Sequence, residues 1–459
     1  MNLLFFQNII SPHQMPYIQY LPKMKGVEKV VVVVPEVNLG ERDALGWDAN
    51  RWLKTEGIRF VVAPSIEEVE EIFRNVNVND NVNVNENENE NENENVDVHV
   101  DVHVNETWCL FSGINAFPAV AEWFRLSLKY QVKRGIITEP PFVYDHPLWQ
   151  HAIRFALKDW RYVKYIDKIF VMGEEYLNYY RFWSKRWDVI PFMYCTEGRD
   201  GNDNENDNDN DNDNVNDNVN VNDNVNDNEN DNENQNENRQ PSAINHQPSN
   251  ISHQPSDFSH HPSPITHQPS TIRHHLKILY VGSLSRRKNV QCLLKACMLL
   301  SPEEQERLEI GIVGDGEQRT ELERMSHNAI ANIHFEGSIP MEKVPAVMEQ
   351  YDILVLPSLH DGWGAVVNEA LTLGLYVICS DHCGAKMLLK HADNGRVFKN
   401  DADKDLATII RACIQKREVI REGAKRRIEW SREHLSGKAV AHYFLHNLEK
   451  YEDSSLYHF

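Results

Sequence analysis

The sequence predicts an α/β protein with two domains, each a parallel sheet covered by helices. Short runs rich in Val, Ile and Leu recur along the chain, and such continuous apolar runs are typical of strands buried on both faces of a parallel sheet. Helical patterns separate the runs, as in repeated β-α-β units. The length of 459 residues is enough for two or three domains, and a long polar tract splits the pattern into two parts.

The first domain is predicted to span residues 1–196. Its strand candidates are the runs LLFF, VEKVVVVVP, IRFVVAP, TWCLFSG, GIITEP and KIFVMG. The stretches IEEVEEIF and AVAEWFRLSLKYQVKR lie between them and predict helices. Two loops at predicted strand ends present polar side chains, for which capping and core roles remain open beside binding. These residues are His13, Gln14, Glu139, Asp145 and His146.

Residues 75–106 form a repetitive insertion within this domain. Asn alternates there with Val, Glu, Asp or His. Alternation with period two is typical of a strand, but Asn, Asp and Glu are poor strand formers, and the tract cannot bury enough apolar surface to order itself. We expect a disordered insertion in the loop between a helix and a strand.

Residues 197–275 are predicted to be a disordered linker between the domains. Residues 200–238 again alternate Asn with acids, and the repeat lacks the glycine turn and the placed bidentate acid of a calcium loop. Residues 240–271 repeat every seven residues, with a Pro in each unit that forbids a coiled coil. Histidines in the repeat leave loose metal binding as an alternative, but an extended linker is favoured.

The charge and the cysteines exclude several classes of protein. The net charge is −22, but the two Asn-rich tracts carry 9 and 14 acids without Lys or Arg, so the remainder is close to neutral. A nucleic-acid-binding protein needs a basic footprint, which is missing. Seven cysteines without C-x-x-C spacing argue against a disulfide framework and favour reduced thiols in a cytoplasmic protein. For Cys379 and Cys383, which flank His382, buried thiols are favoured over a metal site.

The chain has no recognisable export or membrane signal. The N-terminal MNLLFFQNII lacks a basic region before its short apolar run, as a signal peptide would require. No stretch approaches the roughly 20 apolar residues that a transmembrane helix needs. We therefore expect any contact with a membrane to be peripheral.

The second domain is predicted to span residues 276–430. The runs LKILYVG, LEIGIVGDG, NIHFEG, DILVLPS and LYVICSD alternate with helical stretches and predict a parallel sheet. A last helix, predicted within 431–459, places Val440, Tyr443 and Phe444 on one face. This apolar face should dock on a folded surface, back toward the first domain.

Three loops follow strands of the second domain, where α/β proteins bind ligands. The first, GSLSRRKNV, carries Arg287 and Lys288, which can neutralise a diphosphate, although a solvated turn is the plainer interpretation. The second, GDGEQR, has Gly314 and Gly316 and could line a nucleotide or be a simple turn. The third begins at Asp361 and contains the turn Gly362-Trp363-Gly364.

The third loop has the features of a nucleotide-sugar site. Glycines allow the backbone to approach a ligand, and the following helix starts with unpaired N–H groups that favour phosphate. Glu369 lies in the first turn of that helix, where an acid can hold ribose hydroxyls.

Together the three loops resemble the C-terminal domain of family 4 retaining glycosyltransferases (glycosyl transferases group 1). The family pattern G-R-L-x-x-x-K corresponds to Gly282-Ser283-Leu284 with Lys288, so Ser283 replaces Arg. The pattern E-x7-E corresponds to Asp361 and Glu369, with Asp in place of the first Glu. The resemblance implies the GT-B fold, in which two Rossmann-like domains face each other across a cleft, and it assigns DVIPFMYCTE to the connection between the domains.

The resemblance also implies roles for individual residues. Lys288 and Arg287 would grip the donor diphosphate, Asp361 would contact the donor sugar, and Glu369 would contact ribose. Asp361 and Lys288 are therefore the predicted catalytic residues. The full donor-binding set is Gly282, Ser283, Arg287, Lys288, Gly314, Gly316, Asp361, Gly362, Trp363, Gly364 and Glu369. The candidates on the acceptor side are His13, Gln14, Glu139 and His146.

The implied reaction moves a sugar from a nucleotide-diphosphate sugar to a hydroxyl of a glycan or lipid-linked acceptor, with retention. The leaving diphosphate would deprotonate the acceptor, so neither a metal nor a cofactor is expected. This fits polysaccharide biosynthesis in the cytoplasm, at the inner face of the membrane. Three alternatives remain open: a sugar-nucleotide epimerase of the same fold, a non-catalytic sugar-nucleotide-binding protein, and a metal-binding repeat protein.

Overall fold

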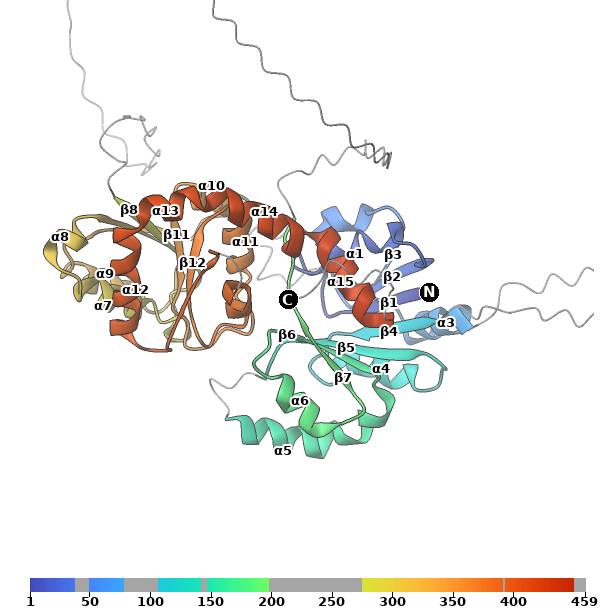
Figure 1. The fold of residues 1–459 in the computed structure, drawn as a ribbon. Helices are drawn as coiled ribbons and strands as arrows, with labels where there is room; N and C mark the ends of the chain where they lie inside the picture. The colour runs from blue at the N-terminus through green and yellow to red at the C-terminus, as the bar shows by residue number, and fades with distance from the viewer. Residues whose placement is uncertain (38–48, 78–105, 142–146, 198–274, 391–392, 450–459) are drawn as a thin grey trace, which may run out of the picture. The chain divides into compact units, whose positions relative to one another are not determined.

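The computed structural model describes residues 1–37, 49–77, 106–141, 147–197, 275–390 and 393–449. The described parts of Met1–Gly201 and Ile272–Phe459 belong to one compact unit. They contain two parallel sheets (Figure 1), which confirms the predicted α/β class. Apart from a few end residues, the insertion at 75–106 and the linker at 197–275 lie outside the described residues.

The first sheet has seven strands in the order β3-β2-β1-β4-β5-β6-β7, and every neighbouring pair is parallel. The strands are β1 (Asn2–Phe6), β2 (Lys29–Val34), β3 (Ile58–Val62), β4 (Thr107–Phe111), β5 (Lys133–Thr138), β6 (Lys168–Met172) and β7 (Asp188–Phe192). The first six are the six predicted runs. The seventh corrects the assignment of DVIPF to a domain connection, because these residues pair in register with β6.

Short helices connect these strands. They are α1 (Met15–Ile18), α3 (Ile66–Asn77), α4 (Pro118–Ser127), α5 (Leu148–Lys158) and α6 (Leu177–Trp183), with 3-10 turns η1 (Leu21–Lys23), η2 (Ala49–Lys54) and η3 (Trp160–Tyr165). Before α3, the backbone N–H of Ser65 donates to Glu68 at 2.7 Å, and the hydroxyl of Ser65 accepts from the N–H of Glu68 at 3.2 Å. This capping box starts the helix, which continues two residues past the predicted start of the insertion at Asn75.

The second sheet has six parallel strands in the order β10-β9-β8-β11-β12-β13. They are β8 (Leu276–Val281), β9 (Leu308–Val313), β10 (Asn332–Gly337), β11 (Ile353–Leu356), β12 (Tyr376–Ser380) and β13 (Gly395–Phe398). From β8, successive strands are added on one side as β9 and β10 and on the other side as β11, β12 and β13. The strand order therefore reverses between β8 and β11, and their carboxyl ends form the switch point where open α/β sheets bind ligands.

Helices flank this sheet and extend beyond it. They are α7 (Val290–Met298), α8 (Pro302–Gln305), α9 (Arg319–Ser326), α10 (Val344–Met348), α11 (Val366–Thr372), α12 (Asp403–Gln415), α13 (Arg417–Glu422), α14 (Ala424–Leu435) and α15 (Gly437–Glu449), with 3-10 turns η5 (Arg286–Lys288), η6 (Met341–Lys343) and η7 (Gly384–Lys390). The last helix, predicted within 431–459, is α15, and the predicted domain boundary at residue 431 falls within α14. An extended residue, Ser436, separates the two helices.

The last helix, α15, packs on the first sheet rather than on the second. Its Phe444 ring lies 5.1 to 6.0 Å from the rings of Phe5, Tyr17, Phe170 and Phe192. The hydroxyl of Tyr443 donates to the carbonyl of Pro191 at 2.7 Å. Figure 1 shows α15 beside α1 and β1. The first strand, β1, and the last described helix, α15, therefore pack in the same apolar core.

Candidate donor site at the strand ends of the second sheet

The loops after β8 and β9 are packed against each other through their glycines. A Cβ on Gly314, which has φ +134°, would lie 1.8 Å from the carbonyl oxygen of Gly282. Hydrogen bonds join the same loops, from Leu284 N–H to the carbonyl of Asp315 at 2.8 Å and from Gln318 N–H to the carbonyl of Leu284 at 2.9 Å. Gly316 is also crowded, by the backbone of Leu284. These predicted donor-binding glycines therefore serve the packing of two loops, whatever ligand lies above them.

The two predicted catalytic residues meet at the switch point. The ammonium of Lys288, at the end of η5, lies 2.5 Å from Oδ2 of Asp361, which follows β11. Their side chains are only 17% and 12% exposed. The hydroxyl of Ser358 lies 3.4 Å from the same carboxylate oxygen. Opposite charges that are largely removed from water form a stronger pair than exposed ones, so this contact defines the shape of both loops.

The neighbours of Lys288 have different roles. Arg287 donates from its guanidinium to the carbonyl of His360 at 3.0 Å, and its own carbonyl accepts from Leu359 at 2.8 Å. This ties the first loop to the third. The Ser283 side chain is exposed, and its carbonyl accepts the hydroxyl of Tyr280 at 2.8 Å. Burial raises the pKa of Tyr280, so this hydroxyl stays protonated and keeps donating.

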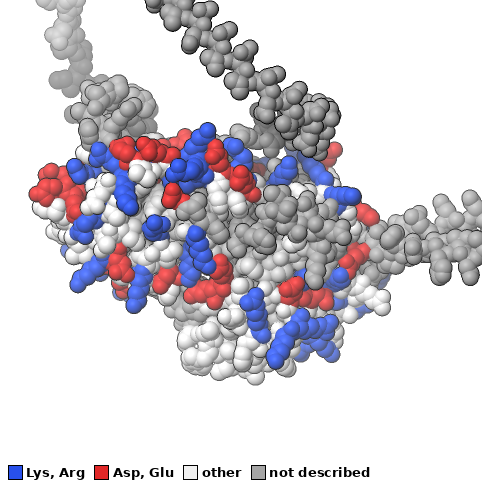
Figure 2. Space-filling model, viewed as in Figure 1, with Lys and Arg blue, Asp and Glu red and all other residues white. Residues whose placement is uncertain are grey.

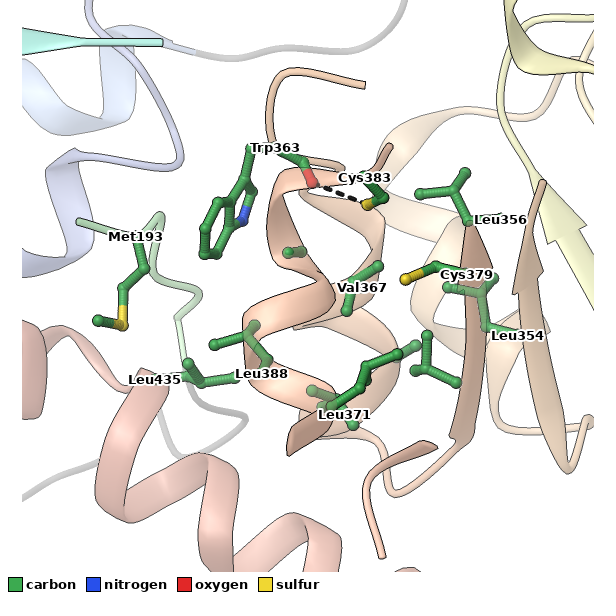
Figure 3. Close-up of a cluster of buried hydrophobic side chains, with 14 of the residues drawn as sticks. Met193, Leu354, Leu356, Trp363, Val367, Leu371, Cys379, Cys383, Leu388 and Leu435 are labelled. Carbon is green, nitrogen blue, oxygen red and sulfur yellow. Dashed lines mark hydrogen bonds between the residues drawn. The ribbon is translucent and has the colours of Figure 1, made fainter. Parts of the chain in front are cut away.

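The turn at Gly362-Trp363-Gly364 is anchored by a buried tryptophan. The Trp363 indole is almost fully buried and donates to Oδ1 of Asn368 at 2.7 Å, and the Asn368 amide donates to the carbonyl of Tyr194 at 2.7 Å. A Cβ on Gly364 would lie 2.8 Å from Leu356 and 2.9 Å from the Cys383 sulfur. Figure 3 shows Trp363 within this apolar cluster. The side chain of Trp363 thus packs in the core beneath the loop, so only backbone atoms of this residue are available to a ligand.

Glu369 lies in the first turn of α11, where the sequence predicts the ribose-binding acid. Burial raises the pKa of its carboxyl to about 7. Within the described residues, no neighbouring charge offsets this burial. A buried carboxyl without a neighbouring cation is stabilised by hydrogen-bond donors that a ligand brings, such as hydroxyl groups.

The acceptor-side candidates of the first domain are joined by a tyrosine that sequence reasoning missed. The hydroxyl of Tyr194 donates to Glu139 at 2.8 Å, and its ring lies 5.5 Å from the His13 ring and 6.2 Å from the Trp363 ring. The second carboxylate oxygen of Glu139 lies 2.8 Å from the position of a Cβ on Gly362. Glu139 therefore reaches the predicted donor loop.

The other candidates on that side are placed differently. The Gln14 side chain accepts from the amide of Gln7 at 2.5 Å, beside α1. Asp145 and His146 lie outside the described residues. The structure therefore brings His13 and Glu139 near the loop at Asp361 and ties Gln14 to its own segment.

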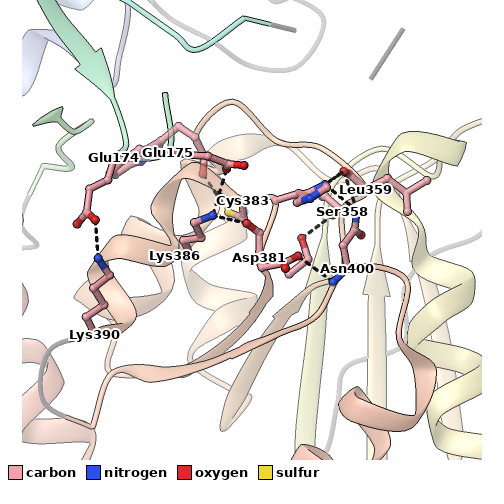
Figure 4. Close-up of polar contacts among 12 residues, drawn as sticks. Glu174, Glu175, Ser358, Leu359, Asp381, Cys383, Lys386, Lys390 and Asn400 are labelled. Atoms are coloured by element: carbon pink, nitrogen blue, oxygen red, sulfur yellow. Dashed lines mark hydrogen bonds and ion pairs between the residues drawn. The ribbon is translucent and has the colours of Figure 1, made fainter. Parts of the chain in front are cut away.

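A polar network at the end of β12 adds residues that the sequence did not indicate (Figure 4). The amide of Asn400 contacts the carbonyl of Leu359 at 3.2 Å and Nδ1 of His382 at 2.8 Å. Lys386 pairs with Glu175 at 3.1 Å, and Lys390 pairs with Glu174. A signal in the sequence was the pair Glu174-Glu175, which follows the KIFVM strand after Gly173.

The cysteines near this network are structural. Cys379 and Cys383 are fully buried, and the Cys383 thiol donates to the carbonyl of Trp363 at 3.0 Å. The prediction of buried thiols is confirmed. Among the residues that the structure describes, no cluster of three or more His, Cys, Asp or Glu is placed to bind a metal ion. Within the same residues, no helix combines the length and apolarity that crossing a membrane requires.

Solved structures share the fold over nearly the whole chain. A structure of Anabaena Alr3699/HepE in complex with UDP matches with a TM-score of 0.57 and 12% identity, covering 98% of this chain and all of the other. The apo form of the lipopolysaccharide outer core galactosyltransferase WaaB matches with a TM-score of 0.54 and 13% identity, covering 98% and 99%. At these identities the likeness shows the fold, which is GT-B, as the sequence resemblance implies.

Sequence relatives match about a third of the chain or less. An uncharacterized glycosyltransferase of Methanocaldococcus jannaschii is 26% identical over 155 residues, which are 33% of this chain and 40% of that protein. A Campylobacter jejuni alpha-1,4-N-acetyl-D-galactosaminyltransferase is 33% identical over 131 residues, 28% of this chain and 36% of its own. The chain thus spans 40% or less of these two relatives. Residues 265–433 match the profile of the family described as Glycosyl transferases group 1, to which this part of the chain is similar.

Proposed function

We propose that this protein is a retaining glycosyltransferase that moves a sugar from a nucleotide-diphosphate sugar to a hydroxyl of a glycan or lipid-linked acceptor. The observation that carries the proposal is the Lys288–Asp361 pair at the β8–β11 switch point. The family match over residues 265–433 supports it. The Anabaena protein of the same fold was also solved with UDP-glucose, and the Campylobacter relative is named for an undecaprenol-linked substrate.

Lys288 would stabilise the diphosphate as it leaves. An ammonium has three N–H donors, so Lys288 can keep its contact with Asp361 and still donate to a phosphate oxygen. Asp361 would then serve two purposes: it orients the ammonium and presents its other oxygen to hydroxyls of the donor sugar. Charge that develops on the diphosphate in the transition state meets a cation that is already in place.

No side-chain base is required in this scheme. The leaving diphosphate oxygen takes the proton of the acceptor hydroxyl on the same face of the sugar, while the glycosidic bond to the acceptor forms and the bond to the diphosphate breaks. We propose on this basis that the reaction needs neither a metal nor a cofactor. The remaining task of the protein is to position the acceptor, for which Glu139 approaches Gly362 of the donor loop and His13 lies beside Tyr194.

Glu369 would bind the ribose hydroxyls. Its pKa is raised to about 7, so the carboxyl is protonated below neutrality and ionised above it. An ionised carboxylate accepts two hydroxyl hydrogen bonds, and the protonated form accepts them less well. Donor affinity should therefore rise as the pH increases through 7.

The first experiment is release of nucleotide from a panel of UDP-, GDP- and ADP-sugars in the presence of EDTA. Wild type would be compared with Lys288→Ala and Glu369→Ala, and with the matched exposed controls Lys295→Ala and Glu321→Ala. Release from one donor that only the first two variants abolish would support the proposal. Absence of binding to every donor would refute the site, and dependence on added metal would refute the metal-free scheme.

The same assay separates two alternatives. Ser283 stands where the family has Arg, which favours weakened catalysis as a second candidate. Saturable donor binding without turnover, even with acceptors supplied, would identify a non-catalytic sugar-nucleotide-binding protein. Conversion of the donor in the absence of any acceptor would identify an epimerase.

We further propose that the protein works in the cytoplasm at the inner face of the membrane, with a peripheral contact. Two observations support this location. The cysteines are all buried as free thiols, as expected of a reducing compartment. The Campylobacter relative is named for a substrate carried on undecaprenol diphosphate. Fractionation of cells that produce a tagged full-length chain tests the location.

A further inference from the structure

The first domain carries an apolar surface that its own core does not use. We define the α5–α6 face as residues Leu148–Tyr165 and Leu177–Trp187. Neither α5 nor α6 contains a buried residue. The exposed fraction reaches 80% for both Leu157 and Phe182. Most large exposed apolar side chains of the described chain gather here, including Leu148, Trp149, Ile153, Leu157, Trp160, Tyr165 and Phe182.

The exposed residues form a stripe along one side of α5. Trp149, Ile153 and Leu157 are four residues apart and so lie on one face of α5, and the exposed Trp160 follows at the start of η3. The opposite side of α5 is held to the domain by Phe155, whose ring lies 4.7 Å from Trp183 and 5.9 Å from Trp187. The helix is therefore docked by one ring and turns a second, larger apolar stripe to solvent.

Basic residues accompany this stripe. Arg154, Lys158 and Arg161 each follow a stripe residue in sequence and so form a parallel row beside it. The whole α5–α6 face contains seven Lys or Arg against one acid, Asp159. Figure 2 shows this part of the surface, at the bottom of the view, as mainly uncharged with Lys and Arg along it.

The acid does not cancel the basic row. Asp159 accepts a hydrogen bond from the amide of Asn115 and interacts electrostatically with Arg154, Lys158 and Arg161, and burial raises the pKa of its carboxyl. The exposed charges of the face are therefore almost all positive.

We propose that the α5–α6 face docks on an anionic lipid surface. The combination of exposed Trp, Leu, Ile and Phe with a row of Lys and Arg is the chemistry of a helix that lies in a membrane interface. The rings and aliphatic side chains would enter the boundary between headgroups and acyl chains, and the cations would pair with lipid phosphates. This proposal rests on the proposed function only because that function includes a peripheral membrane contact. The proposal assigns that contact to the residues of the α5–α6 face.

Sedimentation with lipid vesicles tests the proposal on the full-length protein. The vesicles contain either phosphatidylcholine alone or an equal mixture with phosphatidylglycerol. We expect binding to the mixed vesicles that weakens with added salt, and much weaker binding to phosphatidylcholine. Tryptophan fluorescence should shift to the blue on binding, because Trp149 and Trp160 leave water.

Two matched pairs of variants locate the surface. Leu157→Glu/Phe182→Glu should reduce vesicle affinity about tenfold or more, because two exposed apolar anchors are lost. Its control is Ile330→Glu/Val419→Glu, which changes residues of 54% and 56% exposure in the second domain. Lys158→Glu/Lys185→Glu should reduce binding to anionic vesicles by a similar factor, and Lys404→Glu/Lys425→Glu is its control.

Several outcomes would overturn the proposal. One is that wild type does not bind the mixed vesicles. Another is that the control variants lose as much vesicle affinity as the variants of the α5–α6 face. A dimer in gel filtration that Leu157→Glu/Phe182→Glu dissociates, without vesicle binding by wild type, would instead make the face an interface between copies. Vesicle binding and nucleotide release without vesicles are measured separately, so this proposal and the proposed function can fail independently.

Discussion

The strand ends of the two sheets are built in different ways. In the second sheet, the loops after β8 and β9 are joined by backbone contacts, with Gly314 packed directly on Gly282. In the first sheet, a side-chain contact joins Tyr194 to Glu139, beside a backbone bond from the N–H of Cys195 to the carbonyl of His13 at 3.1 Å. The glycine packing of the second sheet tolerates no added side chain, whereas a contact such as that of Tyr194 with Glu139 can be exchanged by substitution. The difference suits the proposed roles, a donor site of constant shape and an acceptor site that can vary.

The largest effect is expected from Gly314→Ala. The new Cβ would lie 1.8 Å from the Gly282 carbonyl oxygen, so the two loops must separate. We expect a loss of about 4 kcal/mol or more in the free energy of unfolding, or failure to fold. The control is Gly26→Ala, which has φ +85° but no atom within 4 Å of the new Cβ and should cost about 1–2 kcal/mol. Equal losses in urea titrations would contradict the importance of loop packing.

The next largest effect concerns Lys288. Lys288→Ala should reduce nucleotide release by about 100-fold or more, because it removes the cation that we propose stabilises the leaving diphosphate. It also leaves Asp361 largely buried without its partner, which lowers stability. The double variant Lys288→Ala/Asp361→Asn should regain stability without regaining activity. Recovery of both would show that Lys288 is needed only for the fold.

A moderate effect is expected from Glu369→Gln, and it depends on pH. In the folded protein the pKa of Glu369 is raised to about 7, above its ordinary value, so the folded state holds a proton that the unfolded state releases. This carboxyl therefore favours folding at low pH and loses that contribution as the pH rises through 7. The free energy of unfolding of Glu369→Gln minus that of wild type, measured by urea unfolding, should therefore be larger at pH 8 than at pH 5. A difference that is independent of pH would contradict the raised pKa.

The smallest effect is expected from Tyr194→Phe. Loss of the hydroxyl frees Glu139, and we expect about 1 kcal/mol of lost stability. Transfer to an acceptor should fall several-fold through its KM, with little change in donor hydrolysis. Tyr280→Phe loses its hydrogen bond to the carbonyl of Ser283 in the proposed donor loop. It should lower donor hydrolysis, with little change in the KM for the acceptor. If both variants affect the same step, the two strand ends do not have separate roles.

Local patterns in the sequence were sufficient for most of the fold. The predicted runs became strands β1 to β6 and β8 to β12, because short apolar stretches between turns and helical segments suit strands that are buried on both faces of a parallel sheet. The run at DVIPF was misassigned because the resemblance placed it in the domain connection, whereas it forms an edge strand, a place where a strand tolerates Pro191. The domain boundary at residue 431 was misplaced because α14 continues to Leu435, and the hydroxyl of Ser436 then accepts from the N–H of Ala439 at the start of α15.

The sequence by itself determined the two parallel sheets, the loops at their strand ends and the acids and cations those loops carry, since hydrophobic periodicity and turn chemistry act over a few residues. Tertiary structure decided which side chains meet. It buried Trp363 beneath its loop, paired Lys288 with Asp361, joined Glu139 to Tyr194 and left the stripe on α5 in solvent. These outcomes depend on packing between segments far apart in the chain, where burial and charge pairing are settled only once the sheets have formed.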